Sequence, residues 1–316
     1  NGVRSAPYVT EGQPLSKTTS ALLRAMRPRQ WTKNIFVFVG IVFDQSLFDP
    51  TALLRVLATF GLLCMTASTI YLINDIVDVE RDRLHPKKKF RPIASGELPV
   101  RVAQIAAVIL PLIALGLSLL LTPALTIVLV VYLLLHIAYS FYLKHIAILD
   151  IFAIAAGFVL RVVAGTVVIS LEAFSPWLYA FMGLLSLFLA VGKRRQELKQ
   201  LGDNAGAVRA SLRQYTIPYL DELLRLCAIS SGIMYTLYAV EAETALVPPP
   251  YMLLTVPFIY YALFRYMFLI HVEDIGGDPT EALFEDRPLQ ISIVAYGVVA
   301  MLLLYFSGLA VGAMAS

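Results

Sequence analysis

Cysteine and histidine are scarce in this sequence, which has two cysteines and four histidines among 316 residues. Cys64 and Cys227 both lie inside apolar runs, so no disulfide framework is available and both are expected to be small core residues. No two histidines have the spacing of a zinc-binding pair such as H-x-x-x-H; they are His85, His136, His145 and His271. Charged residues make up 15% of the chain and the formal net charge is only +3, and we expect no nucleic-acid partner.

Apolar residues dominate instead. Hydrophobic residues account for 59% of the chain and the mean hydropathy is +0.75, well above the apolar share of a soluble domain. The composition therefore predicts an integral membrane protein whose first partner is the lipid bilayer. Residues 1–20 are polar and lack an apolar core, so no cleavable signal peptide is expected. We expect residues 1–22 to form a mobile polar arm and residues 23–316 to form a single transmembrane domain.

The apolar runs predict an all-α bundle of about nine transmembrane helices, because a bilayer core requires roughly 20 apolar residues per helix. The expected spans lie near residues 34–48, 52–76, 101–121, 124–142, 148–170, 175–193, 220–241, 250–270 and 288–312. The odd-numbered connections between these spans contain no Lys or Arg, whereas the even-numbered connections carry them. By the positive-inside rule, this asymmetry predicts a cytoplasmic N-terminus and an external C-terminus.

An acidic face marks the end of the second expected span. At about 100° per residue, Tyr71, Asn74, Asp78 and Asp82 fall on one side of a helix. Carboxylate and amide oxygens at this spacing suit a hard divalent cation such as Mg²⁺, which shares its remaining positions with substrate phosphates. The basic cluster at residues 87–91 would hold those phosphates. The alternative is a solvated helix end followed by a basic stop.

Arg161 lies near the middle of the fifth expected span. On insertion scales, placing an arginine at the bilayer centre costs roughly 2.5–3.5 kcal/mol of free energy. Its side chain should therefore face protein or a wet cavity and have a partner. Asp150 lies three turns earlier on nearly the same face, which Gly157 and Gly165 leave open. Arg161 is therefore a candidate for binding a substrate anion. A buried Asp–Arg or Asn–Arg clamp between helices is the alternative.

Several sequence blocks together resemble the UbiA superfamily of intramembrane prenyltransferases. Residues 74–82 read N-D-x-x-D-x-x-x-D, like the family's first aspartate motif, and residues 85–96 continue as H-P-x-K-x-x-R-P-I-A-S-G. The other blocks are R-P-R-Q-W-T-K-N at 27–34, Y-S-F-Y-L-K-H at 139–145, L-R-x-x-A-G at 160–165 and G-K-R at 192–194. The resemblance covers almost the whole chain and implies a UbiA-like helical bundle with catalytic activity.

The end of the sixth expected span departs from the pattern of most UbiA-type enzymes. Those enzymes have a second aspartate motif in this region, whereas this chain has Lys193 and Arg194. Bases in place of acids favour direct capture of a phosphate anion over a second metal site. Arg195 and Lys199 are equally well explained as topology signals.

The blocks are most similar to the UbiA branch that transfers 5-phosphoribose from phosphoribosyl diphosphate to decaprenyl (polyprenyl) phosphate, a precursor step for cell-wall arabinan. This resemblance implies a Mg²⁺-dependent transferase of the plasma membrane, with its site open to the cytoplasm. The catalytic and metal-binding residues would be Asn74, Asp78 and Asp82. The substrate-binding residues would be Lys33, Tyr71, Lys88, Arg91, Tyr139, Lys144, Arg161, Lys193 and Arg194. The oligomeric state stays open, a homo-oligomer included.

The chemistry of such a transfer fits these residue types. A phosphate monoester is already ionised near neutral pH, so the acceptor needs no general base. Two other functions stay open at this point. A prenyltransferase with a prenyl diphosphate donor and an aromatic acceptor would share the first motif, although the basic end of the sixth span argues against it. A transporter would also place Asp and Arg within the membrane, but here the charged groups cluster on one side.

Overall fold

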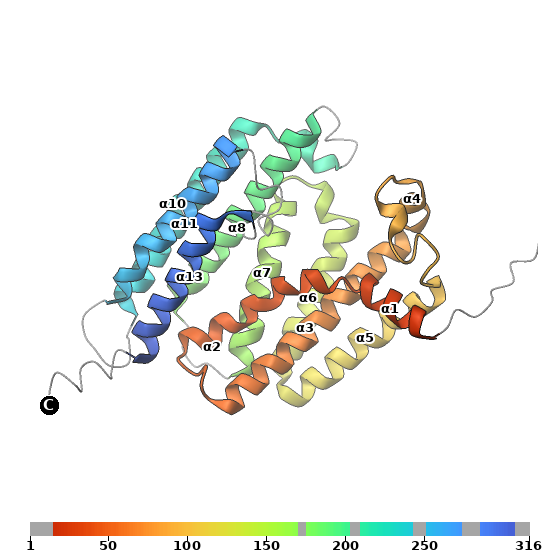
Figure 1. Cartoon of the computed structure of the whole chain (residues 1–316), viewed down its shortest axis with the longest axis horizontal. Coiled ribbons are helices and arrows are strands. Elements are labelled where there is room, and N and C mark those ends of the chain that lie inside the picture. The colour runs from red at the N-terminus through yellow and green to blue at the C-terminus, as the bar shows by residue number, and fades with distance from the viewer. Residues whose placement is uncertain (1–14, 170–174, 203–208, 243–250, 274–284, 307–316) are drawn as a thin grey trace, which may run out of the picture.

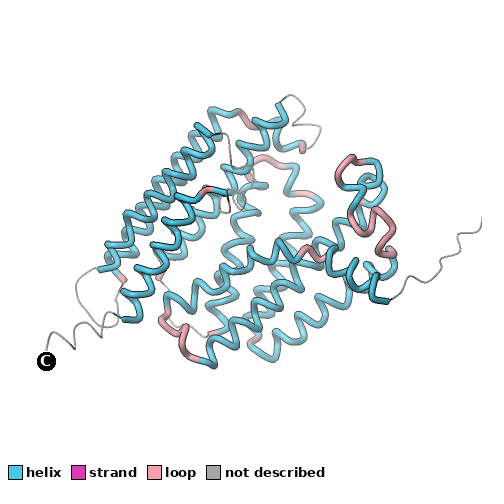
Figure 2. Tube along the Cα trace, in the orientation of Figure 1, coloured by secondary structure: helices cyan, strands magenta, loops and turns pink. Residues whose placement is uncertain are grey.

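The computed structural model describes residues 15–169, 175–202, 209–242, 251–273 and 285–306. Within these ranges the regular structure is entirely helical, as Figure 2 shows, and no strand occurs. The longer α-helices are α3 (Pro50–Val77), α5 (Val100–Leu121), α6 (Pro123–Phe141), α7 (Leu149–Val168), α8 (Pro176–Leu201), α10 (Ile217–Glu241), α11 (Val256–Phe268) and α13 (Arg287–Met301). The all-α prediction is confirmed.

Shorter helical segments connect or extend these helices. The α-helical ones are α1 (Leu15–Ala25), α2 (Val39–Phe43) and α4 (Val79–Leu84). The 3₁₀ segments are η1 (Pro28–Phe38), η2 (Lys88–Phe90), η3 (Leu143–His145), η5 (Ala210–Gln214) and η6 (Tyr251–Thr255). Two π-helical turns, η7 (Leu269–Glu273) and η8 (Leu302–Phe306), continue α11 and α13. Because α1 begins at Leu15, the second part of the predicted polar arm is helical, while residues 1–14 lie outside the described residues.

Several long helices begin with the same local sequence, a side-chain cap followed closely by proline. The Asp49 side chain accepts a hydrogen bond from the Thr51 backbone N–H at 2.8 Å, and Pro50 opens α3. Thr122 caps α6 in the same way, with Pro123 next. Such caps satisfy N–H groups that have no partner within the helix, and proline loses nothing at the first helical position. Pro50 and Pro123 therefore mark helix starts.

Eight helices in the described part of the chain are long and apolar enough to cross a membrane. They correspond to the second to ninth expected spans. The first expected span, residues 34–48, is instead occupied by the end of η1 and by α2, which together are shorter than a span. The η1 segment packs closely on α7, since a Cβ added at Gly165 would lie 1.9 Å from the Val37 carbonyl oxygen. Polar residues of η1 thereby reach the interior of the bundle.

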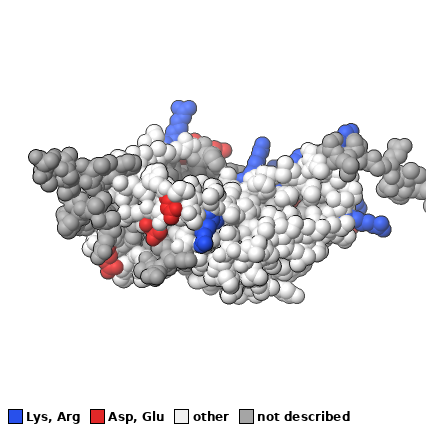
Figure 3. All heavy atoms as spheres, turned by 90° about the horizontal axis from the view of Figure 1, so that it is seen from below, with Lys and Arg blue, Asp and Glu red and all other residues white. Residues whose placement is uncertain are grey.

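The helices form two groups, with α6 and α7 between them (Figure 1). In one group, α3 packs against α5 and against η1; in the other, α10 packs against α8 and α11, and α13 packs against α11. Helix α7 contacts α6, α8 and η1, so it joins the groups. The face in Figure 3 is largely free of charged side chains, as expected of a surface that meets lipid. Asp150 and Arg161 of α7, and Arg194 and Arg195 of α8, are buried inside the bundle.

Candidate active site

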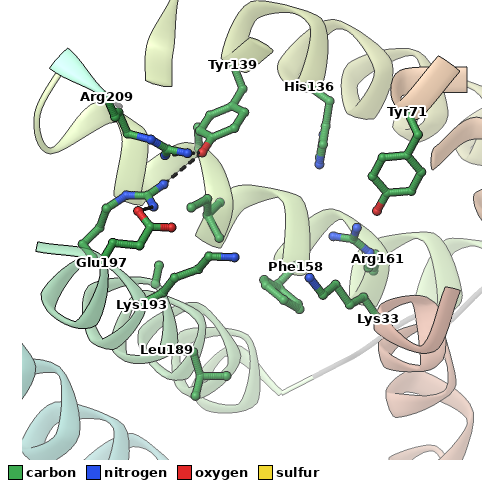
Figure 4. A pocket seen from close by; sticks show the side chains of 14 residues that line it. Lys33, Tyr71, His136, Tyr139, Phe158, Arg161, Leu189, Lys193, Glu197 and Arg209 are labelled. Atoms are coloured by element: carbon green, nitrogen blue, oxygen red, sulfur yellow. Dashed lines mark hydrogen bonds and ion pairs between the residues drawn. The ribbon is translucent and has the colours of Figure 1, made fainter. Parts of the chain in front are cut away.

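A cavity of about 260 Å³ lies where η1, α3, α6, α7 and α8 meet (Figure 4). Basic side chains dominate its polar lining, and Glu197 is the one carboxylate among the described residues that line it. The lining consists of Lys33, Tyr71, His136, Tyr139, Ala153, Ile154, Phe158, Arg161, Leu189, Ala190, Lys193, Arg194, Glu197 and Arg209. Positive charge in a partly enclosed space attracts anions, and phosphates above all.

Arg161 is only 6% exposed and makes three hydrogen bonds to neutral groups. Its guanidinium donates to Asn34 Oδ1 at 2.9 Å, to the Gly157 carbonyl at 2.6 Å and to the Tyr132 hydroxyl at 2.6 Å. It also lies over the Tyr132 and Phe158 rings. No carboxylate pairs with it in the described part of the chain. The Asn–Arg contact is therefore present, and the Arg161 charge is balanced by no acid within the described ranges.

Asp150, the acid considered as the partner of Arg161, pairs with Arg194 instead. Both side chains are completely buried, and Arg194 Nε lies 2.7 Å from Asp150 Oδ2. Asp150 also accepts from Ser211 at 3.0 Å and from Tyr215 at 2.7 Å. Burial and this hydrogen bond raise the pKa of Tyr215, so its hydroxyl keeps the proton that it donates. The Asp150–Arg161 clamp is thus not formed, because the register of α8 brings Arg194 to Asp150.

The remaining donors of Arg194 are also used within the protein. Arg194 Nη1 lies 2.6 Å from Glu197, and Nη2 donates to the Tyr139 hydroxyl at 2.9 Å. Arg209 donates to the same hydroxyl oxygen at 2.8 Å, as Figure 4 shows. A hydroxyl oxygen that accepts two hydrogen bonds keeps its own proton for a different acceptor. Arg194 therefore orients Tyr139 and Glu197 from within an ion-pair network.

The lysines differ in their relation to the cavity. Lys33 from η1 and Lys193 from α8 line it, and both project into the space shown in Figure 4. Lys144 lies on η3 outside the lining, and its backbone carbonyl accepts a hydrogen bond from Ser211 at 3.0 Å. The structure thus brings Lys33, Tyr71, Tyr139, Arg161, Lys193 and Arg194 together around one cavity. Lys144 does not line this cavity.

The acidic motif lies one turn beyond Tyr71, at the end of α3. Helix α3 ends at Val77, Asp78 is its C-terminal cap, and Asp82 belongs to α4, so the expected single face is interrupted. Asp75 and Asp82 are nevertheless brought together, because Arg91 Nη1 lies 3.1 Å from Asp75 Oδ1 and 2.6 Å from Asp82 Oδ2.

Other basic groups surround these two aspartates. Arg27 reaches Asp75 at 2.5 Å and lies over the Tyr71 ring, and Lys88 lies 4.0 Å from Asp82. Asp78 is more accessible, with its side chain 32% exposed and 3.6 Å from Arg81. Asn74, one turn before Asp78, is half-buried.

Comparison with known proteins agrees with this architecture. The model of the UbiA prenyltransferase family matches residues 34–278. The chain belongs to the UbiA prenyltransferase family. A UbiA homologue from Archaeoglobus fulgidus bound to DMAPP and Mg²⁺ superposes with a TM-score of 0.69 at 16% identity, over 90% of this chain and 99% of that chain. Digeranylgeranylglyceryl phosphate synthase gives a TM-score of 0.66 at 19% identity, with the same coverage.

Curated UbiA-family relatives match along nearly their full length. The decaprenyl-phosphate phosphoribosyltransferase of Mycolicibacterium smegmatis is 39% identical over 94% of this chain and 96% of its own length. The protein of the same name from Corynebacterium glutamicum is 36% identical over 94% and 92%. That of Mycobacterium tuberculosis H37Rv is 34% identical over 90% and 94%.

The residues of the UbiA motif fit a divalent cation by their chemistry. Asp75 Oδ2 is buried and has no hydrogen-bond partner among the described residues, although its other oxygen is paired twice. A buried carboxylate oxygen without a partner is costly, and a cation beside it would satisfy it. Within the described ranges no three His, Cys, Asp or Glu side chains converge as a complete metal site. Mg²⁺ needs only one or two carboxylates, since water and substrate phosphates supply its other ligands.

Some residues of the site escaped the sequence analysis. Asp75 lies in the motif but off the face that the helical spacing selected. Its partners Arg27 and Arg91 come from segments before α3 and after α4, which helical spacing does not relate to it. His136 and Arg209 line the cavity without belonging to any charge pattern. The position of His136 one turn before Tyr139 was the available signal, since helical neighbours share a face.

Proposed function

We propose that this UbiA-family protein transfers 5-phosphoribose from phosphoribosyl diphosphate to decaprenyl phosphate, giving decaprenylphosphoryl-5-phosphoribose and diphosphate. The full-length similarity to three curated decaprenyl-phosphate phosphoribosyltransferases supports this reaction. The observation that carries it from the structure is the basic cavity, in which Arg161 has a buried charge and no carboxylate partner in the described chain. The proposed acceptor and donor both bring phosphate groups to such a cavity.

The donor is expected to lie between the motif and the cavity. Mg²⁺, when bound, would neutralise the departing diphosphate, and Asn74, Asp75 and Asp78 are the residues to hold it. Arg91, which spans Asp75 and Asp82, holds the two acids in place beside the leaving group. Tyr71 lies between the motif and the cavity, since it lines the cavity and precedes the acids by one turn. The diphosphate is thereby expected at the end of α3, with the sugar inside.

The acceptor phosphate and the donor's 5-phosphate are expected among the cavity cations. Lys33, Arg161 and Lys193 line the cavity, and so does Tyr139, whose hydroxyl oxygen accepts from Arg194 and Arg209 and whose proton is left to donate. Charge-assisted hydrogen bonds from such groups are stronger than neutral ones and hold a phosphate in a fixed direction. Attack on the anomeric carbon opposite the diphosphate inverts its configuration, by analogy with other glycosyl transfers. No residue has to remove a proton from the ionised acceptor.

The setting of this reaction is part of the same proposal. The protein is a multi-pass membrane protein by its eight apolar helices. The distribution of Lys and Arg over the connections supports a cytoplasmic N-terminus in the plasma membrane, with the motif and the cavity mouth on that side. Soluble phosphoribosyl diphosphate would then enter from the cytoplasm, while the polyprenyl chain stays in the bilayer.

The proposal is tested with purified protein, Mg²⁺ and two labelled donors. Label from ribose-labelled phosphoribosyl diphosphate is expected in the lipid extract when decaprenyl phosphate is present. Label from geranyl diphosphate is expected to stay out of an aromatic acceptor such as 4-hydroxybenzoate. The opposite pattern would assign a prenyltransferase. Uptake of phosphoribosyl diphosphate into sealed vesicles without diphosphate release would assign a transporter.

A further inference from the structure

His136 is a cavity-lining residue to which the reaction above gives no role. It lies on α6, and its ring projects into the space that also receives Tyr71 and Arg161 (Figure 4). Two contacts fix the ring: Nδ1 lies 3.0 Å from the backbone oxygen of Tyr132, and the imidazole stacks on the Tyr132 ring with centroids 4.0 Å apart. The ring is therefore held in one orientation before any substrate arrives.

The contact with Tyr132 also fixes which nitrogen carries the proton. A backbone carbonyl only accepts hydrogen bonds, so Nδ1 of His136 must donate. In the neutral ring the other nitrogen, Nε2, is then a bare acceptor. Nε2 has no hydrogen-bond partner within the described residues.

Gly157 on α7 brings this acceptor close to Arg161. A Cβ added at Gly157 would lie 3.2 Å from His136 Nε2 and 3.5 Å from Arg161 Nη1. A hydrogen-bond acceptor and a phosphate-binding cation thus lie on either side of one small residue. A ligand at this place must offer an O–H or N–H donor beside a negatively charged or acceptor group.

The substrates differ in what they can offer to Nε2. Ionised phosphate oxygens only accept, so neither the diphosphate nor the phosphate of decaprenyl phosphate can donate to it, and the polyprenyl chain has no polar hydrogen. The ribose of phosphoribosyl diphosphate has two free hydroxyls, one on C2 next to the anomeric carbon and one on C3. We propose that His136 Nε2 accepts a hydrogen bond from one of these ribose hydroxyls and selects ribose over deoxyribose donors. This inference rests on the proposed function and names the specificity determinant of that site.

The experiment couples a change in the protein to a change in the donor. His136→Phe keeps a flat ring on Tyr132 but removes the acceptor, and His136→Gln retains one. Each is assayed with phosphoribosyl diphosphate and with its 2-deoxy and 3-deoxy analogues. In the wild type, removal of the contacted hydroxyl should lower kcat/KM about 10- to 100-fold. In His136→Phe, kcat/KM for the natural donor should fall by a similar factor, and kcat/KM for that analogue should be the same as in the wild type. His136→Gln should recover part of the loss.

His145→Phe is the matched control, because His145 is exposed on η3 and does not line the cavity. It should leave the preference for the natural donor unchanged. Full activity of His136→Phe, or an equal loss with all three donors, would overturn the inference. Thermal-shift titration compares the binding of the three donors without turnover. If His136→Phe does not fold, His136→Gln is compared with the wild type instead. A wild type that binds these donors but forms no lipid product would refute the proposed transfer. Donor binding would still show whether the effect of His136→Phe depends on the ribose hydroxyl.

Discussion

Arg161 combines two roles that a single side chain rarely serves. Its three hydrogen bonds hold Asn34, Tyr132 and the Gly157 carbonyl, while its charge has no carboxylate partner in the described chain. Ordinary packing would not need a guanidinium here, because an apolar side chain of similar volume avoids the desolvation of a charge. An anion bound in the cavity would compensate the charge, as the proposed function requires.

Arg161→Lys keeps the charge but loses the planar fork, and we expect turnover to fall by one or more orders of magnitude. Lost charge-assisted hydrogen bonds are worth about 1.5–3 kcal/mol each. Arg55→Lys is the matched control, since Arg55 donates to the Val168 carbonyl and does not line the cavity. Turnover and melting temperature in detergent are measured together. A variant that melts much lower yet turns over normally in its folded fraction would show that Arg161 is only a clamp.

Asp78→Asn should abolish transfer, and the wild type should need a divalent cation, because Asp78 is the most accessible acid of the motif. Asp75→Asn should act similarly through the unpaired Oδ2. Asp49→Asn, at the opposite end of α3, is the control and should retain activity, since asparagine also caps helices well. Rates are compared in Mg²⁺ and in chelator. Equal rates under the two conditions would rule out the metal role.

Lys193→Ala should weaken the apparent affinity for decaprenyl phosphate more than that for phosphoribosyl diphosphate. Lys193 enters the cavity from α8, on the side away from the acidic motif where the diphosphate is expected. Matched titrations of the two substrates, each at saturation of the other, provide the measurement. A defect confined to the donor would move Lys193 to the donor's 5-phosphate.

At the scale of helices, the Asp150–Arg194 pair ties α7 to α8. Removing one partner of a buried pair leaves an uncompensated charge and typically costs about 3–5 kcal/mol. Asp150→Asn should therefore lower the melting temperature markedly and also disturb Tyr139. Glu222→Gln is the control: its pair with Arg225 is exposed and worth about 1 kcal/mol or less. Equal melting temperatures for the two variants would contradict the proposed tie.

A second ion pair, between Arg265 and Asp286, joins α11 to the start of α13 and makes stability depend on pH. Asp286 caps α13 through the Leu289 N–H at 2.8 Å and receives both Nε and Nη2 of Arg265, which holds the pKa of Asp286 below its usual range. A lowered folded pKa stabilises the protein above the unfolded pKa, about 3.9, and this stability is lost as the pH falls through the folded value. Asp286→Asn should therefore flatten the decline in melting temperature below about pH 4. An unchanged decline would show that other acids cause it.

For the molecule as a whole, the sequence predicted the bundle well because lipid-length apolar runs and proline-marked starts are local signals. The run at residues 34–48 misled, because it is apolar enough for a span but begins with η1, whose residues Lys33 and Asn34 face the interior. The predicted topology of the two termini stays a prediction.

The site was predictable as a set of residue types but not as a set of contacts. Helical spacing collected Tyr71, Asn74 and Asp78, whereas the partner of each charge depends on how the helices meet. Arg194 was expected to bind phosphate directly, and its guanidinium is instead engaged by Asp150, Glu197 and Tyr139. Such tertiary pairings leave no periodic trace in a single sequence. The roles of the individual site residues stay predictions.

The most direct measurement is the mass of the lipid product formed by the purified protein. With decaprenyl phosphate, Mg²⁺ and phosphoribosyl diphosphate labelled separately in the ribose and the β-phosphate, the lipid should gain one phosphoribosyl group and all of the ribose label. The β-phosphate label should appear as free diphosphate in equal amount, and Asp78→Asn should form neither product. A lipid that carries the β-phosphate label, or donor hydrolysis without any labelled lipid, would contradict phosphoribosyl transfer.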